Sequence, residues 1–524
     1  MSEQDTGQIA TLQRPTTNDQ EEWKAYWKQQ GQLWRTEPEV DAEQQKYLAE
    51  RRATMPDIEK GTYPFGGIKL NRADVEWLLA THENGRGPVD WTDESQRGRK
   101  GLDLRGSDLS GKDLSGLPLA RILGGILLER TQTIAGERAD LAAICLEGAD
   151  LSSAHLENAS FFAANLKRVN LSDAHLEEAK LLVANLERAH FAGADLKKVM
   201  FGQANLGRAG ITYTDLRGAD LHRAYLQDAT LYASKLGKAN LSGAQLERTY
   251  LAAVTLHDEN GVGPELVDIE WGNTNLTVAD WSGVKMLGDE YLAKQTKSKK
   301  GQLEGLRVAI RANRQLAVTL QSQGLNEEAT RFTYRALVLQ RKLLLLEARY
   351  NRLGQLKAEL KRLEKLLNEP VNSGRSGESW QKRMGRRRER LERTQKELDQ
   401  INFQWHLADL WQRAQKFRQY LFSLFLAVTT GYGYRAWRSF ASYVFVILVF
   451  ATIYFLLGPR TGLPISYGDA IVFSMTSFHG RGFSPGENIG LSNPLTIFAA
   501  IEAFVGLVIE ITFIATLTQR LFGK

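Results

Sequence analysis

The chain has 524 residues, which is long enough for about three domains. Its net charge of +6 is modest for this length and comes partly from a basic cluster between Lys382 and Arg393, which excludes a uniformly basic protein. The single cysteine, Cys145, excludes an intrachain disulfide and a cysteine-based metal site.

The first 60 residues are hydrophilic and contain no apolar export segment, so we expect the chain to begin in the cytoplasm. Trp23 and Trp27 share one face of a predicted helix, which we expect to dock onto a neighbouring element; stacking on a ligand is the alternative. An apolar stripe between Ile58 and Trp91 predicts a small helical cap. We assign residues 1–100 to this polar and helical cap region.

A strict repeat follows. From Leu141 to Leu256 every fifth residue is apolar, over 24 consecutive pentads, and the residue two positions earlier is alanine in 17 of them. A period of five fits neither an α-helix nor a flat strand, so it predicts a chain that turns a corner every five residues. We expect leucine to point inward, Asp or Asn before it to serve the bend, and four pentads to form one square coil. Six coils would make a stack roughly 29 Å long.

The register of the repeat persists from Leu266 to Trp281, so His257 to Pro264 is predicted to be an insertion. An earlier run, Leu104 to Leu119, follows another register. These pentads, of the form A(D/N)LXX, resemble the pentapeptide-repeat family, which implies a right-handed β-helix solenoid over residues 101–287. The repeat is specific for a fold and weakly informative about function.

After Asp289 the pattern becomes helical, and we assign residues 288–420 to a helical connector. Ala312 to Lys342 looks like a single tetratricopeptide-type hairpin. Leucines then recur every seven residues from Leu339 to Leu367, and a second helix is predicted from Trp380 to Phe417. We interpret these two segments as an antiparallel coiled-coil pair; self-association of the leucine stripe is the alternative.

Two segments are long and apolar enough to cross a bilayer: Ser439 to Leu457, and Pro494 to Thr518 with Glu502 and Glu510. Lys and Arg are concentrated outside this pair, so both termini are predicted to be cytoplasmic. We therefore expect a multi-pass protein of a bacterial-type inner (plasma) membrane. Residues 421–438 would be an interfacial juxtamembrane segment, and residues 439–524 a transmembrane pore domain.

Between the two spans, Tyr467 to Phe478 predicts a helix of about a dozen residues, too short to cross, followed by glycine-rich backbone. Irregular backbone at membrane depth is tolerated only where it lines water or is buried in protein, so this pattern predicts a re-entrant pore loop. The residues that carry the pattern are Phe473-Ser474-Met475-Thr476-Ser477-Phe478-His479-Gly480-Arg481-Gly482-Phe483-Ser484-Pro485.

This run resembles the pore helix and filter of the two-transmembrane-helix potassium-channel family, and the resemblance covers about 90 residues. It implies a homotetramer around an ion path, with Gly506 at the hinge of the inner helix. The residues that it places at the filter are His479, Gly480, Arg481, Gly482, Phe483 and Ser484.

The filter nevertheless departs from the family, whose threonine-valine-glycine-tyrosine-glycine is replaced by Gly480 to Ser484. Four Arg481 side chains facing the axis would repel cations and favour anions; turned outward, each would need a partner such as Glu502. Glu510 lies one helical turn past Gly506, so we expect it to line the cavity. We interpret both glutamates as intramembrane acidic sites.

A second segment, Thr429-Thr430-Gly431-Tyr432-Gly433, matches the potassium filter more closely by letter. It precedes the first span, and the apolar run before it is too short to cross. We interpret it as a turn at the membrane surface.

The sequence therefore predicts an ion-channel subunit that is gated through its cytoplasmic solenoid and helical domains. Its predicted partners are permeant ions, the lipid bilayer, its own copies and an unidentified cytoplasmic ligand or protein at the solenoid; a solenoid that serves only as a rigid spacer is the alternative to this last partner. The alternative is a membrane-tethered pentapeptide-repeat scaffold that does not conduct.

Other classes fit the sequence poorly. It contains no HExxH, nucleophile elbow, phosphate loop or Cys/His cluster, so we predict no enzyme, catalytic residue, metal or cofactor. Some pentapeptide-repeat proteins imitate DNA and bind gyrase, which requires a strongly acidic surface. Residues 139–256 contain 13 acidic and 12 basic residues, which argues against such a mimic, and nucleic acid is not an expected partner.

Overall fold

The chain divides into two units in the computed structural model: residues 1–296 with 311–332, and residues 297–310 with 333–524. The residues that the structure describes are 13–57, 59–126, 140–349, 360–361, 363–364, 378–399, 403–429, 431–432, 436–461, 465–480 and 494–522.

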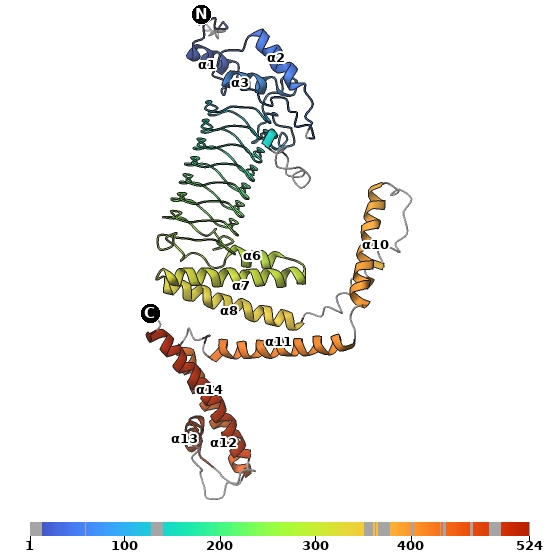
Figure 1. The fold of residues 1–524 in the computed structure, drawn as a ribbon. Coiled ribbons are helices and arrows are strands. Elements are labelled where there is room, and N and C mark those ends of the chain that lie inside the picture. The colour runs from blue at the N-terminus through green and yellow to red at the C-terminus, as the bar shows by residue number, and fades with distance from the viewer. Residues whose placement is uncertain are drawn as a thin grey trace, which may run out of the picture. The chain divides into compact units, whose positions relative to one another are not determined.

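The first unit begins with helices that lie at one end of a stack of coils (Figure 1). The predicted docking of the first helix is confirmed: Trp23 and Trp27 are buried, and Trp27 Nε1 donates a hydrogen bond to the Glu37 carbonyl at 2.9 Å. The helices are α1 (Gln20–Gln29), α2 (Ala42–Arg52), α3 (Arg72–Ala80) and the short α4 (His82–Gly85).

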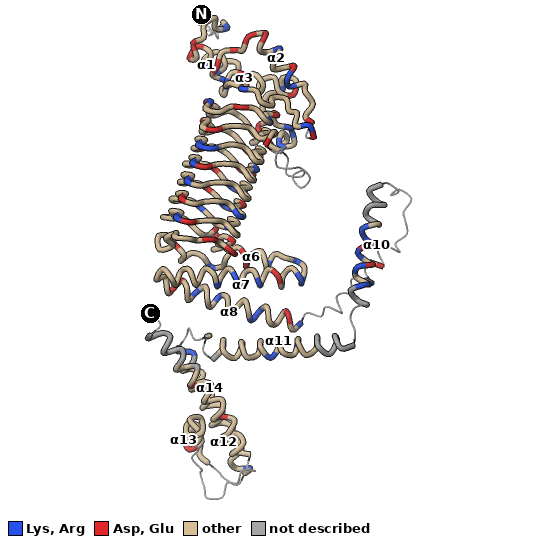
Figure 2. The backbone as a smooth tube through the Cα atoms, viewed as in Figure 1, with Lys and Arg blue, Asp and Glu red and all other residues tan. Residues whose placement is uncertain are grey.

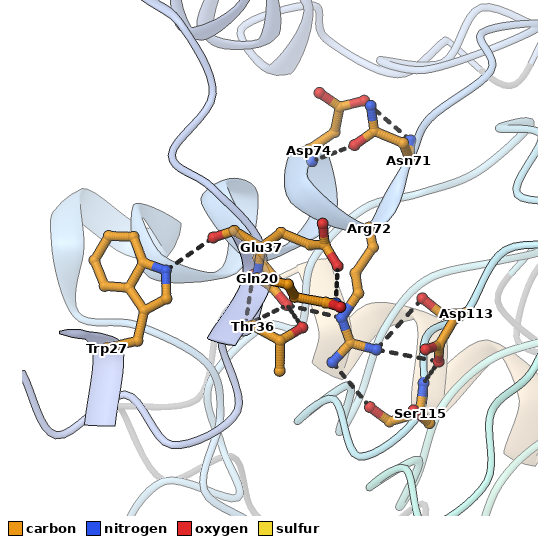
Figure 3. A network of polar contacts seen from close by, with 10 residues as sticks. Gln20, Trp27, Thr36, Glu37, Asn71, Arg72, Asp74, Asp113 and Ser115 are labelled. Carbon is orange, nitrogen blue, oxygen red and sulfur yellow. Dashed lines mark hydrogen bonds and ion pairs between the residues drawn. The ribbon is translucent and has the colours of Figure 1, made fainter. Parts of the chain in front are cut away.

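Helix α3 joins these N-terminal helices to the stack through a buried polar network (Figure 3). The Glu76 carboxylate is fully buried and accepts hydrogen bonds from the backbone N–H groups of Thr36 and Glu37 and from Arg72 Nε at 2.8 Å. Arg72 also donates to Asp113 Oδ1 and to the Ser115 carbonyl, both in the first coil. A charge buried at this depth is tolerated because every side of it is paired.

The predicted coil of four pentads is confirmed. Parallel bridges join residues that are 20 apart, from Cys145 with Asn165 to Lys235 with Thr255. The pentad leucines and alanines fill the interior, as Leu156 and Ala154 show. One expected position is wrong: Leu141 is 57% exposed, because Ala142 and Ile144 fill the interior there instead.

The repeat is interrupted at two places, one near each end of the stack. The run from Leu104 to Leu119 belongs to a coil of its own, because Asp103 pairs with Leu123. Near the other end the bridge spacing rises from 20 to 25 at Asn240 with Glu265, which confirms an insertion of one pentad's length within His257 to Pro264.

From Leu146 to Leu251, each corner of a coil contains a left-handed residue two positions after the large apolar residue of the pentad. Val183, for example, has φ 60°, which is a strained conformation for a β-branched residue. Its N–H donates to the Gly202 carbonyl of the next coil at 3.0 Å, so the strained corner also forms a bond between coils. The expected part of Asp or Asn is confirmed at Asp150, whose Oδ1 accepts from the Ser152 N–H at 2.9 Å.

Helices cover the other end of the stack, where an open coil would expose unpaired backbone and apolar side chains. Gln323, at the turn after α7, bonds to the last coil through the Leu276 N–H at 2.7 Å and the Thr274 carbonyl at 2.8 Å. Phe332 packs edge-on against Trp281. The helices at this end are α6 (Gly288–Gln295) and the parts of α7 (Lys299–Ser322) and α8 (Asn326–Arg349) that belong to residues 311–332.

Two neighbouring carboxyl groups lie at this covered end. Burial and the nearby Asp289 carboxylate raise the pKa of Glu265 to about 7. Burial raises the pKa of Asp289 to about 6, although its Oδ2 accepts a hydrogen bond from the Leu266 N–H at 2.8 Å. Both groups therefore bind a proton more readily in the folded chain than ordinary carboxyl groups do.

The second unit is helical (Figure 1). Residues 421–429 of the expected juxtamembrane segment form the end of α11, and Lys416 of this helix pairs with Glu347 of α8 at 3.1 Å. Leu353 and Leu367 of the expected leucine run lie outside the described residues, and the coiled-coil pair stays a prediction. The helices are α10 (Glu378–Asp399), α11 (Phe403–Thr429), α12 (Ala436–Leu457), the 3-10 turn η2 (Gly458–Thr461), α13 (Tyr467–Phe478) and α14 (Pro494–Phe522).

The raised pKa of Glu265 predicts how the solenoid responds to pH. A carboxyl group whose pKa is higher in the folded chain contributes most stability at low pH and loses it as the pH rises from about 4.5 to about 7. Glu265→Gln should therefore stabilise the chain at pH 8 by about 1 kcal/mol, a value discounted because water reaches part of the site. Urea unfolding at pH 5 and pH 8 measures this, with the exposed Glu259→Gln as control. An equal effect of Glu265→Gln at both pH values would contradict it.

Candidate functional site

The candidate site is formed by α12, α13 and α14, which contain almost no charge (Figure 2). Two segments, Phe440–Thr461 and Pro494–Ile511, are long and apolar enough to cross a membrane. Between them α13 has 12 residues, and Ser466 caps its first turn by accepting a hydrogen bond from the Asp469 N–H at 3.1 Å. A helix of 12 residues is about 18 Å long, too short to span the bilayer core.

Helix α13 runs antiparallel to α12 beside its central turns. In the middle of α13, Phe473 packs against Tyr454, with ring centroids 4.7 Å apart. Near its end, Phe478 packs against Tyr443 at 4.8 Å. Tyr454 and Tyr443 are eleven residues, or three turns, apart, so they lie on one face of α12. The short helix therefore shares its level with the interior of the first candidate span.

Glu502 of α14 joins all three helices. Its side chain is fully buried, Oε2 accepts a hydrogen bond from Tyr454 Oη at 2.6 Å, and Oε1 is hydrogen-bonded to Ser474 Oγ. Ser474 Oγ also bonds to the Ile447 carbonyl at 2.9 Å. A buried carboxyl group is costly unless it is hydrogen-bonded, so these contacts fix α13 between α12 and α14.

Gly506 lies where α14 touches the end of α13. A Cβ added to it would lie 2.1 Å from the Phe478 carbonyl oxygen, a distance that only glycine avoids. The sequence suggested a hinge at this position. The structure shows a close approach between two backbones, for which glycine is equally required.

His479 follows α13 directly and bridges the two long helices. Its Nδ1 is hydrogen-bonded to Glu510 Oε1 of α14, and its Nε2 lies 3.1 Å from Tyr443 Oη of α12. Gly480 continues the turn with φ 67°. The sequence predicts that Glu510 lines the cavity of a pore; in the structure its carboxylate is hydrogen-bonded to His479.

The structure brings together part of the predicted site. His479, Gly480, Gly506 and Glu510 lie around the end of α13, and Glu502 of α14 contacts Ser474 in the second half of α13. Arg481, Gly482, Phe483 and Ser484 lie outside the described residues. Glu502 was considered as a partner for Arg481; among the described residues its hydrogen-bond partners are Tyr454 and Ser474.

The sequence analysis missed Tyr443 and Tyr454. Two hydroxyl groups on one face of an otherwise apolar span were the signal that could have found them.

The filter-like segment before the first span is elsewhere in the second unit. Gly431 and Tyr432 form a turn after α11, where Tyr432 Oη lies 2.9 Å from Ser423 Oγ. The Tyr432 ring packs against Tyr334 of α8 with centroids 5.9 Å apart. These are contacts of a connecting turn, and they match the interpretation of this segment as a turn.

Comparison with known proteins identifies the repeat. Residues 144–251 match the family model for pentapeptide repeats, in overlapping segments with eight copies. The chain therefore contains a pentapeptide-repeat region, and it also carries two helices long and apolar enough to cross a membrane. A comparison with curated proteins finds no match.

Several solved structures resemble the repeat region. QnrB1, a plasmid-mediated fluoroquinolone resistance protein, is 20% identical, with 36% of this chain and 83% of that chain covered and a TM-score of 0.25. HetL, a pentapeptide-repeat protein involved in heterocyst differentiation regulation in the cyanobacterium Nostoc, is 21% identical, covers 40% and 96%, and has a TM-score of 0.17. Rfr23 from the cyanobacterium Cyanothece is 23% identical, covers 36% and 94%, and has a TM-score of 0.12. At these identities and TM-scores the likeness assigns no activity to this chain.

The Glu502 network makes a prediction about stability. Tyr454→Phe removes one hydrogen bond to a buried carboxyl group and should destabilise the helical unit by about 1.5 to 3 kcal/mol. Denaturant titration of the purified chain in detergent measures this loss. The control is Tyr467→Phe, because the Tyr467 side chain is exposed and its hydroxyl has only a 3.3 Å contact with Thr452. Equal stability of the two variants would contradict the proposed importance of the network.

Proposed function

We propose that the chain is a subunit of an oligomeric ion channel, and that α13 and the backbone after it form the re-entrant part of its pore. The likeness of Phe473 to Pro485 to the two-transmembrane-helix potassium-channel pore favours a homotetramer, with the filter at His479 to Ser484. The solenoid and the first part of the chain would be cytoplasmic, as the distribution of Lys and Arg indicates.

The observation that carries the proposal is the position of α13. Its contacts reach Tyr454, Ile447 and Tyr443, all within the first candidate span, and Glu502 and Gly506 within the second. If these two helices cross a bilayer, α13 and Gly480 lie at membrane depth. Non-helical backbone is tolerated there only beside water or inside protein, and a path for ions supplies the water.

Gating is proposed to enter from the N-terminal side through α11. The turn at Tyr432 links the end of α11 to α12, and Arg438 of α12 donates to the Ala427 carbonyl of α11 at 3.3 Å. A movement of α11 would therefore act on the first span directly. What the solenoid would sense is an unidentified cytoplasmic ligand or protein.

The second candidate is a membrane-tethered scaffold, in which the repeat binds a partner and the helices only anchor it. The exposed coils of the solenoid favour it, because pentapeptide repeats offer a long surface without catalytic groups. This candidate predicts no current.

Recordings from the purified full-length chain in planar bilayers test the channel directly. Discrete currents are expected, and Val472→Pro should abolish them, because proline breaks the middle of α13. Arg481→Ala should shift the reversal potential in asymmetric salt towards cation preference if this side chain faces the path. A folded chain in the bilayer that passes no current would contradict the channel proposal. The membrane-tethered scaffold would then be the remaining candidate.

The same recordings test the gating route. Tyr432→Ala removes the contacts with Ser423 and Tyr334 and should change the open probability several-fold without moving the reversal potential. Phe422→Ala, an exposed position on α11, is the control. An unchanged open probability in Tyr432→Ala would exclude this turn as the route.

A further inference from the structure

Among the described residues of α12, α13 and α14 and the turn after α13, His479, Glu510 and Tyr443 form a cluster of ionisable side chains that is partly exposed. The side chains of His479 and Glu510 are 39% and 38% exposed, whereas Glu502, two turns earlier on α14, is fully buried. The two glutamates of one helix therefore differ in role. Glu502 is sealed among three helices, and Glu510 lies at the edge of the helix face that its own subunit leaves uncovered.

The three side chains can hold two protonation states of His479 without moving. In the neutral imidazole, Nδ1–H donates to Glu510 and Nε2 accepts from the Tyr443 hydroxyl. When His479 gains a second proton, Nε2–H donates, and the same hydroxyl accepts it. Because the tyrosine hydroxyl can either donate or accept a hydrogen bond, the geometry permits the change of charge on His479.

The charge of the cluster follows the proton. With a neutral imidazole and an ionised Glu510 the cluster carries one negative charge per subunit; with a protonated imidazole it carries none. Among the described residues, Tyr443 of α12 and Glu510 of α14 are the titratable groups that contact His479. Asp469 lies at the opposite end of α13, where its Oδ2 accepts a hydrogen bond from Ser466 Oγ at 2.7 Å.

We propose that Glu510 gives the pore a preference for cations and that protonation of His479 reduces this preference. The inference rests on the proposed channel function and names its substrate class. In an oligomer the cluster is repeated around the axis, so Glu510 forms a ring of carboxylates of the kind that selects cations. Each proton taken up by His479 cancels one charge of this ring.

The test is the reversal potential of the full-length chain in asymmetric potassium chloride at pH 5.5 and pH 8.5. The wild type should have a cation-to-anion permeability ratio about threefold or more higher at pH 8.5. His479→Gln, which keeps a hydrogen-bonding side chain and cannot gain a charge, should hold the high ratio at both pH values. Glu510→Gln should have at pH 8.5 the low ratio that the wild type has at pH 5.5.

The control is His190→Gln, at an exposed position on the solenoid. Its permeability ratio should change with pH as that of the wild type does. A pH dependence that survives His479→Gln, or a ratio unchanged in Glu510→Gln, overturns the inference while the channel proposal stands. A folded wild type that passes no current overturns both. The unfolding midpoint of each variant shows whether the variant folds. If His479→Gln does not fold, the permeability ratio of Glu510→Gln alone tests the inference.

Discussion

The membrane-length part of the chain depends on one buried carboxyl group. Glu502 lies on a helix that would face hydrocarbon, where an unpaired acid is expensive, and its hydrogen bonds to Tyr454 and Ser474 are what make it tolerable. The same bonds hold a half-length helix at the level of both long helices. Gly506 then allows the end of that helix to touch α14. Together with the packing of Phe473 on Tyr454 and of Phe478 on Tyr443, this cluster fixes the position of α13 against the two long helices.

The two units are stabilised in different ways. The same three features recur at the corners of the solenoid: a buried leucine, a small residue beside it and a left-handed residue that bonds to the next coil. Because these contacts recur, the stability of the solenoid does not depend on a single corner. The two ends of the stack need elements that cover them, and these elements are attached through the Glu76 network and Gln323. The described parts of α12, α13 and α14 show no such repeat, and a few specific polar contacts stabilise their packing.

These differences explain what the sequence could predict. The period of five determines the coil, because the same local rule applies at each corner; it failed at Leu141, where the repeat begins and the neighbouring coil differs. The lengths of the apolar runs were enough to place two candidate spans and the short helix between them. The partners of Glu502 were not predictable, because Tyr454 is 48 residues away and only the packed helices bring it close. The same holds for Tyr443 and His479, which are 36 residues apart.

The central claim is that α13 lies inside the bilayer between the two spans. The most direct measurement is the depth of a fluorophore on single cysteines introduced at Val472, Leu448 and Phe440 in a Cys145→Ala background, read by quenchers fixed at known depths in the lipid. All three positions are exposed on the subunit. The account predicts that Val472 lies near the bilayer centre, at the depth of Leu448 and deeper than Phe440. A dye at Val472 that reports the headgroup level or bulk water would contradict it.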